Sequence, residues 1–217
     1  MNKALKIKIP DFLSRTKAIK LHDWYVNKMP DWWWYKAIRS GEEGEDVEYI
    51  ELNFGNISEI QNKKLVARKN LSKDKFTYSF NRTKDDHIDG CGCTECELKT
   101  YFKSKEFMKI VKESTGIEVS EITESFSSWY DSGDWLSIHS DKPNGKVAFV
   151  YQLSKDWIPE YGGLLNYKDD DGNITSFLPE FNSLTLFTLD DSNSFHYVSE
   201  VIKDCPTRRL AHTGWLK

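Results

Sequence analysis

The sequence predicts an α+β protein whose C-terminal half is a β-sandwich or a barrel-like jelly roll. Three observations indicate this fold. Apolar residues at helical spacing are frequent in the N-terminal half, and short alternating segments separated by Gly, Pro, Asn and Asp follow from Glu118 to the end. No linker, repeat or low-complexity stretch divides the chain. We therefore expect a single domain over residues 1–217, with a jelly-roll core at 118–217. Residues 1–117 should support this core, with their helices packed on one outer face.

Three helices are predicted before the jelly roll. They are residues 14–28, a segment from Asn56 or Ser58 to about Asn70, and the segment from Ser104 to Gly116. Ser14 and Ser104 can cap the first and third helices, because a serine hydroxyl accepts a hydrogen bond from a free N–H of the first turn. Pro30 should end the first helix and Gly116 the third.

Alternation of apolar and polar residues predicts the strands. Two are expected in the N-terminal half, at residues 47–53 and 76–80. The jelly-roll strands are expected at residues 118–130, 134–141, 146–153, 163–168, 174–178, 183–189, 195–201 and 208–216. The aromatic run Trp32-Trp33-Trp34-Tyr35 is interpreted as strand and core packing, with a wall facing a substrate as the alternative.

Composition and charge exclude several classes of protein. Aromatic residues make up 14% of the chain, too many for a disordered protein. A net charge of −4 at pH 7 does not favour binding to nucleic acid or to anionic membranes. The chain shows no apolar run of signal-peptide or membrane-spanning length. We therefore expect a soluble, cytoplasmic protein with neither nucleic acid nor membrane as a partner.

The segment 82–97 has the composition of a polar loop and contains three of the four cysteines. Three thiolates and an imidazole could complete a tetrahedral structural zinc site, which would order a loop with few apolar residues. The candidate ligands are His87, Cys91, Cys93 and Cys96. The alternative is a surface loop with free cysteines, or one used in substrate binding.

The stretch Tyr130–Asp141 contains a candidate metal site. His139 and Asp141 are two residues apart, and on an extended strand such residues point to the same face. Two ligands do not hold a catalytic metal alone, and His196 is the candidate for the third. Two histidines and one carboxylate with open positions form the facial triad of non-haem Fe(II) oxygenases. The residues therefore predict an iron site.

The last predicted strand places a cation in the same core. One face of this strand is formed by Arg209, Ala211, Thr213 and Trp215. A buried unpaired guanidinium is very costly, so Arg209 requires an anionic partner. A dicarboxylate cosubstrate could pair one carboxylate with Arg209 and chelate the metal through a 2-oxo acid at its other end. Thr213 could donate a further hydrogen bond to it.

In these residues the chain resembles the prolyl 4-hydroxylase-like 2-oxoglutarate/Fe(II) oxygenases, a family that includes the hypoxia-factor and ribosomal-protein prolyl hydroxylases. The resemblance extends from about Ser127 to Leu216 and rests on the order and spacing of short motifs. These are Tyr130, Gly133-Asp134, His139-Ser140-Asp141, Lys142-Pro143-Asn144-Gly145, Leu153-Ser154-Lys155-Asp156-Trp157, Gly162-Gly163, Pro179-Glu180-Phe181-Asn182, Phe187, His196-Tyr197-Val198, Arg209 and Trp215. The N-terminal half is only loosely similar.

The resemblance implies that the jelly roll is a double-stranded β-helix, as in cupin-like proteins. It also implies an enzyme that uses Fe(II), 2-oxoglutarate and O2. It assigns His139, Asp141 and His196 to iron. It assigns 2-oxoglutarate to Arg209, with Tyr130, Thr213, Gln152 and Trp215 expected around it. Gln152 is a departure, because the family usually has a Tyr at this position, just before the Leu that ends the strand. A Gln amide can also donate a hydrogen bond to a carboxylate, so we expect binding to be retained but weakened, with a modified cosubstrate pocket as the alternative.

The resemblance further implies hydroxylation of an unactivated C–H bond, with a prolyl residue of a protein or peptide as the first candidate substrate. Trp129, Trp135 and the Trp32–Trp34 run could line an aromatic groove for it. A free amino acid or small metabolite is the second candidate. A catalytically silent cupin-like binding module is an alternative from another class. The sequence does not indicate an oligomeric state.

Overall fold

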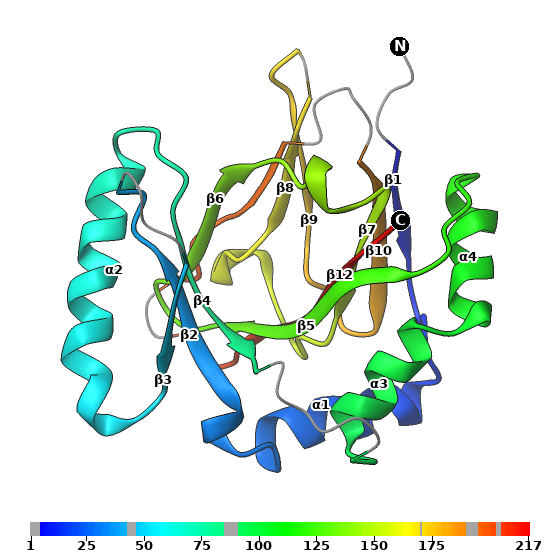
Figure 1. Cartoon of the computed structure of the whole chain (residues 1–217), viewed down its shortest axis with the longest axis horizontal. Coiled ribbons are helices and arrows are strands. Elements are labelled where there is room, and N and C mark those ends of the chain that lie inside the picture. The colour runs from blue at the N-terminus through cyan, green and yellow to red at the C-terminus, as the bar shows by residue number, and fades with distance from the viewer. Residues whose placement is uncertain (1–4, 43–46, 85–90, 170, 190–194, 203–204) are drawn as a thin grey trace.

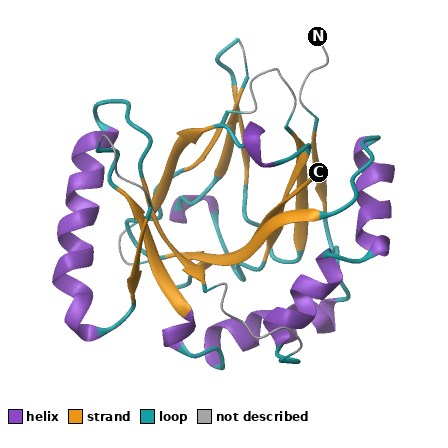
Figure 2. Ribbon diagram, in the orientation of Figure 1, coloured by secondary structure: helices purple, strands orange, loops and turns teal. Residues whose placement is uncertain are grey.

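The computed structural model describes residues 5–42, 47–84, 91–169, 171–189, 195–202 and 205–217. Within these ranges the strands form one curled antiparallel sheet, and the helices lie outside it (Figure 1, Figure 2). The helices are α1 (Arg15–Asn27), α2 (Ile57–Leu71), α3 (Thr94–Phe102) and α4 (Lys105–Thr115). The strands are β1 (Lys6–Ile9), β2 (Trp34–Arg39), β3 (Glu48–Glu51), β4 (Tyr78–Thr83), β5 (Ile122–Tyr130), β6 (Trp135–His139), β7 (Val147–Gln152), β8 (Leu165–Lys168), β9 (Ile174–Phe177), β10 (Ser183–Thr188), β11 (His196–Val198) and β12 (Arg209–Leu216).

The strand order explains how distant parts of the chain meet. It is β1-β10-β7-β12-β5-β4-β6-β11-β8-β9, and β2 and β3 are attached through β4. Because the sheet curls, β11 and β8 face β7 and β12 across its interior (Figure 1). The predicted double-stranded β-helix is confirmed, and the N-terminal half adds strands β1 to β4 to its edges and its middle.

Two apolar layers lie on opposite sides of the sheet. Along β7, Val147, Phe149 and Tyr151 belong to the layer under the helices, whereas Ala148 and Val150 belong to the interior layer. This is the alternation expected when both faces of a strand are buried. Helices α1, α3 and α4 cover the first layer, while α2 packs separately on β2 and β4.

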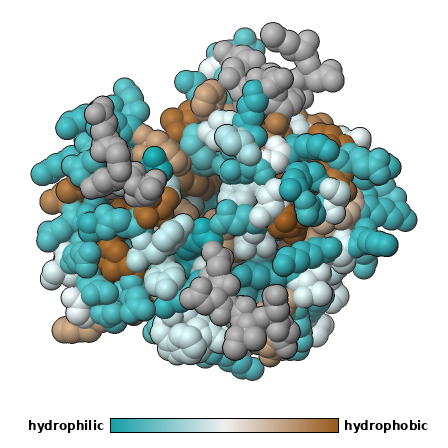
Figure 3. All heavy atoms as spheres, in the orientation of Figure 1, coloured by the Kyte–Doolittle hydropathy of each residue, from teal (hydrophilic) through white to brown (hydrophobic). Residues whose placement is uncertain are grey.

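The predicted helix boundaries are confirmed by their caps. The Ser14 hydroxyl accepts a hydrogen bond from the N–H of Lys17, and the Ser104 hydroxyl accepts one from the N–H of Phe107. Gly116 ends α4 in the left-handed conformation. None of the described helices is both long and apolar enough to cross a membrane. Figure 3 shows a mostly hydrophilic face with a few hydrophobic patches.

Two elements were not predicted. Helix α3 begins inside the segment that we expected to be a loop. The sequence did not indicate this helix because its buried side includes a carboxylate. Glu95, Leu98 and Phe102 are all buried, so a charged residue interrupts the apolar stripe that marks a helix. Strand β1 is only four residues long, too short for its alternation to stand out, and is held by its pairing with β10.

Candidate metal centre and cavity

His139, Asp141 and His196 converge in the interior of the curled sheet. The Nε2 atom of His139 lies 3.4 Å from one Asp141 carboxylate oxygen, and the Nε2 atom of His196 lies 3.2 Å from the other. One donor atom from each residue lies within 4.8 Å of the other two. Two imidazole nitrogens and one carboxylate are the donor set of a facial-triad iron site, so these residues fit Fe(II).

Strand register places the two imidazoles side by side. His139 ends β6 and His196 begins β11, and the two residues are directly paired across these strands. The Nδ1 of His139 lies 3.0 Å from the Ser137 carbonyl oxygen, to which it can donate when Nε2 binds a metal. Asp141 lies beyond the strand end, at the cap of a short 3-10 turn (Lys142–Asn144). The ligands therefore converge through this turn, and the extended geometry expected for His139 and Asp141 is wrong.

A buried charge cluster fixes the loop that precedes β6. The Asp134 carboxylate, with no exposed surface, accepts hydrogen bonds from Lys36 and Lys64, both at 2.6 Å, and from the Ser79 hydroxyl at 2.8 Å. It also accepts from the backbone N–H of Asp131 at 2.9 Å. These bonds satisfy both carboxylate oxygens, which a buried carboxylate requires. They hold the connection between β5 and β6, and with it the start of the strand that ends at His139.

Asp141 is held in its ionised form. Burial opposes ionisation, but hydrogen bonds with His139 and His196, and the charge of these imidazoles, outweigh it. The pKa of Asp141 is therefore well below its ordinary value. An ionised carboxylate between two imidazoles is ready to bind a cation without first losing a proton.

Arg209 is a buried cation with no carboxylate partner among the described residues. Its side chain is 2% exposed and its guanidinium lies 4.8 Å from the centre of the Tyr130 ring. Its Nε donates a hydrogen bond to the Gly163 carbonyl oxygen. Gly163 has φ +63°, and a Cβ there would lie 2.8 Å from the Arg209 Cδ. Only glycine thus combines this left-handed backbone with such a close approach to the arginine.

A cavity of about 590 Å³ joins the triad to Arg209. Its lining includes all three candidate iron ligands and four more predicted residues, namely Tyr130, Thr213, Trp215 and Arg209. The Thr213 hydroxyl donates to the Phe149 carbonyl oxygen at 3.0 Å, so the predicted donation to a cosubstrate would require the hydroxyl to rotate away from this oxygen. Gln152 is buried and does not line the cavity, and its Oε1 has no partner among the described residues.

Tyr167 is a candidate binding residue that the sequence did not reveal. It lies on β8, paired with His196 and two residues after Leu165, which lines the cavity. Its hydroxyl is buried and has no hydrogen-bond partner among the described residues. Burial and the charge of Asp141 raise the pKa of Tyr167, while Arg209 lowers it, so the phenol stays protonated at neutral pH. An orphaned donor this close to both charges indicates a polar ligand.

The predicted tryptophan groove is not present. Trp129 packs in the layer under the helices and donates from Nε1 to Asp131 at 3.0 Å. Trp135 is buried beneath α2, and its Nε1 donates to the Thr77 hydroxyl. Neither residue lines the cavity, because each lies on the other face of its strand from Tyr130 or Leu136.

The aromatic run is also outside the cavity. Trp34 has no exposed surface and packs against Trp129 at a ring distance of 4.2 Å, as the core interpretation predicts. Trp32 is 66% exposed. The interpretation of residues 32–34 as a substrate wall is therefore wrong.

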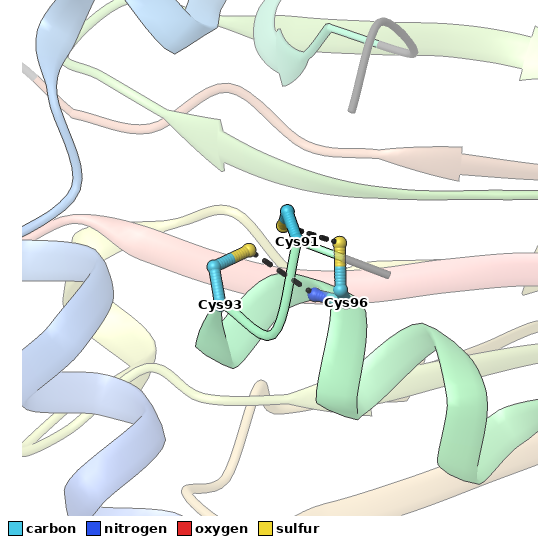
Figure 4. A group of neighbouring side chains, drawn as sticks. All are labelled: Cys91, Cys93 and Cys96. Atoms are coloured by element: carbon cyan, nitrogen blue, oxygen red, sulfur yellow. Dashed lines mark hydrogen bonds between the residues drawn. The ribbon is translucent and has the colours of Figure 1, made fainter. Parts of the chain in front are cut away.

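A second cluster lies at the start of α3, where Cys91, Cys93 and Cys96 meet (Figure 4). The fourth predicted zinc ligand, His87, lies outside the described residues. Burial and hydrogen bonds with the other two thiols raise the pKa of Cys96 to about 12. None of these three cysteines lines the cavity.

Comparison with known proteins agrees with the geometry. Residues 125–217 match the family model of the 2OG-Fe(II) oxygenase superfamily. The chain is 30% identical over 118 residues to prolyl 3-hydroxylase OGFOD1 of Mus musculus. This alignment covers 51% of this chain and 21% of that protein. It is 32% identical over 97 residues to prolyl 3,4-dihydroxylase OGFOD1 of Ostreococcus tauri, covering 40% of this chain and 19% of that one. The matches thus span about a fifth of these curated relatives.

A solved structure shows the same fold over nearly the whole chain. The crystal structure of a Pseudomonas putida prolyl-4-hydroxylase matches with a TM-score of 0.55 and 14% identity, covering 98% of this chain and 91% of that chain. At this identity the likeness concerns the fold alone.

Proposed function

Because residues 125–217 match the family model of the 2OG-Fe(II) oxygenase superfamily, we propose that the chain is an Fe(II)- and 2-oxoglutarate-dependent dioxygenase that hydroxylates a prolyl residue in a protein or peptide. The observation on which this proposal mainly rests is the pairing, in one cavity, of a complete facial triad with a buried arginine that has no acidic partner among the described residues. A metal alone would not require Arg209. A dicarboxylate that also reaches the metal would.

The energetics favour an anionic ligand at Arg209. A buried guanidinium without an opposite charge is destabilising by several kcal/mol, on the order of 3–5. Burial lowers the pKa of Arg209, while the neighbouring phenols raise it, and an arginine retains its proton under all physiological conditions. The cation thus persists in the free protein, and a carboxylate could satisfy its two terminal nitrogens in bidentate fashion.

Each candidate residue then has a defined task. His139, Asp141 and His196 would hold Fe(II), and the Nδ1 of His139 fixes the orientation of its ring through Ser137. Bound Fe(II) would supply the activation of O2 that couples decarboxylation of 2-oxoglutarate to succinate with hydroxylation of a C–H bond. Arg209 would bind the distal carboxylate.

Two tyrosine hydroxyls are candidate donors to the cosubstrate, Tyr130 in the cavity lining and Tyr167 just behind it. Burial raises the pKa of Tyr130 as well as that of Tyr167, so both phenols keep their protons. Tyr130 lies beside Arg209, its direct neighbour across β5 and β12. Tyr167 would offer the hydroxyl that Gln152 does not, because it approaches the same region from β8 on the opposite side of the cavity.

The outer cavity suits an apolar ring such as that of proline. Phe76, Tyr49 and Ile138 line it, and the last two are also exposed. Arg82 on the wall is paired with Glu124 at 3.0 Å and stacks over Phe126, so its charge is already compensated. These features, together with the relatives named as prolyl hydroxylases, support a prolyl substrate.

The test is incubation of the whole chain with Fe(II), 2-oxoglutarate and a library of proline-containing peptides, followed by mass spectrometry. A gain of one oxygen atom on proline, with succinate formed in equal amount, is expected. The Asp141→Ala variant serves as the control that lacks a metal ligand and should give neither product. Oxygen gain only on free amino acids would support the small-molecule alternative. No succinate with any substrate pool would support the silent binding module.

A further inference from the structure

We propose that Cys91, Cys93 and Cys96 form a second metal site that binds a soft divalent cation. We expect this cation to be zinc in the purified protein. The three sulfur atoms lie within 4.8 Å of one another (Figure 4). Cys93 is the N-cap of α3, Cys96 is in its first turn, and Cys91 precedes them in the adjoining segment. The site is distinct from the triad, because none of these residues lines the cavity.

The sulfur geometry favours a metal over a disulfide. The Sγ atoms of Cys91 and Cys96 are 3.0 Å apart, longer than the about 2.05 Å of an S–S bond. Sulfurs at about 2.3 Å from a tetrahedral zinc are about 3.8 Å from one another. The three sulfurs lie within 4.8 Å of one another, so they could surround one ion after the Cys91 and Cys96 sulfurs move apart by less than about 1 Å. A disulfide would use two sulfurs and give no reason for the third to converge.

Burial and the neighbouring thiols raise the pKa values of Cys93 and Cys96, so three thiolates would form only with a bound cation, and the local backbone favours that state. The N–H of Cys96 donates to the Sγ of Cys93 at 3.4 Å, and the positive end of the α3 dipole stabilises negative charge there. Gly92 has φ +67°, a left-handed conformation that turns the chain between Cys91 and Cys93 so that both sulfurs reach the same point. Three protein thiolates leave a fourth tetrahedral position for water or a further ligand.

The site would act as a structural anchor for α3. In the same first turn of this helix, buried Glu95 accepts hydrogen bonds from Tyr25 and Ser127, and from Thr83 at 3.2 Å. Helix α3 has only nine residues, and an isolated helix of this length is not stable in water. Metal binding at its first turn would fix the helix start and thereby hold Glu95 in its buried network.

The experiment is metal analysis and Co(II) substitution of the whole chain, prepared under reducing conditions. Wild type should retain one zinc per chain, and Co(II) in its place should give the near-ultraviolet absorption of thiolate-to-metal charge transfer, which imidazole and carboxylate ligands do not give. Asp141→Ala should keep this absorption, since it affects the other site. Cys205→Ser is the matched control thiol. Cys93→Ser and Cys96→Ser should lose both zinc and absorption.

A second measurement covers variants that fold poorly. A zinc chelator should lower the Tm of wild type and of Cys205→Ser, and re-addition of zinc should restore it. The proposal is overturned if wild type binds Co(II) without thiolate absorption, or if its Tm does not respond to zinc. It is also overturned if thiol counting and intact mass show a disulfide between two of the three cysteines. All these readouts are independent of hydroxylase activity.

Discussion

Removing the Tyr167 hydroxyl should separate cosubstrate binding from fold stability. Tyr167→Phe keeps the ring that packs on Phe187 and His196 and deletes one buried oxygen. A hydrogen bond to a charged group contributes about 1.5–3 kcal/mol, so 2-oxoglutarate should bind roughly 10- to 150-fold more weakly. The free protein should be equally or more stable, because the deleted hydroxyl has no partner among the described residues and burying one costs about 1–3 kcal/mol.

The assay is calorimetric titration of Mn(II)-loaded protein with 2-oxoglutarate and with 2-oxopentanoate, which lacks the distal carboxylate. The variant should lose affinity for the first ligand only. Tyr151→Phe is the matched control, since its hydroxyl donates to Asn182 at 2.9 Å on the other face of the sheet. That variant should bind 2-oxoglutarate normally but unfold at a lower temperature.

Two results would refute the role of Tyr167. If the variant binds 2-oxoglutarate as tightly as wild type, the hydroxyl makes no contact with it. If both ligands weaken equally, the effect is on the metal end or on the fold. Failure of wild type to bind 2-oxoglutarate would instead refute the proposed function itself.

The remaining predictions concern Arg209, Gly163 and His212. Arg209→Met should weaken 2-oxoglutarate binding more than 100-fold, because losing a charge pair costs on the order of 3 kcal/mol. Calorimetric titration should show an unchanged affinity for Mn(II). Gly163→Ala should have the same selective effect to a smaller degree, because its Cβ would displace Arg209; unchanged binding would contradict the close approach. Burial lowers the pKa of His212 from 6.5 to about 3, so the unfolded chain takes up a proton that the folded chain does not. Stability should therefore fall as pH decreases through this interval, by up to about 1.4 kcal/mol per pH unit, and His212→Gln should show a shallower fall in chemical denaturation.

The sequence was most informative where local pattern and chemistry coincide. Alternation located the eight C-terminal strands, and the short motifs singled out the triad and Arg209. Side-chain direction was harder, as Trp129 shows: it is one residue before Tyr130, yet faces the opposite layer. The sequence did not point to Tyr167 because its position near the metal site depends on β8 pairing with β11. These segments are almost thirty residues apart, and local periodicity does not reveal such a pairing. Helix α3 was not predicted because Glu95 interrupts its apolar stripe, and the tertiary partners that stabilise this buried carboxylate cannot be read from the sequence.

The position of β4 limits what can be cut from this chain. Residues 125–217 match the superfamily model, but β4 comes from before that region and is hydrogen-bonded to both β5 and β6. A fragment of the matched residues would leave the strand that ends at His139 without one of its two neighbours. It would also uncover the apolar face beneath α1, α3 and α4. The matched region is therefore not an autonomous folding unit, and grafts or truncations should retain the chain from β1 onward.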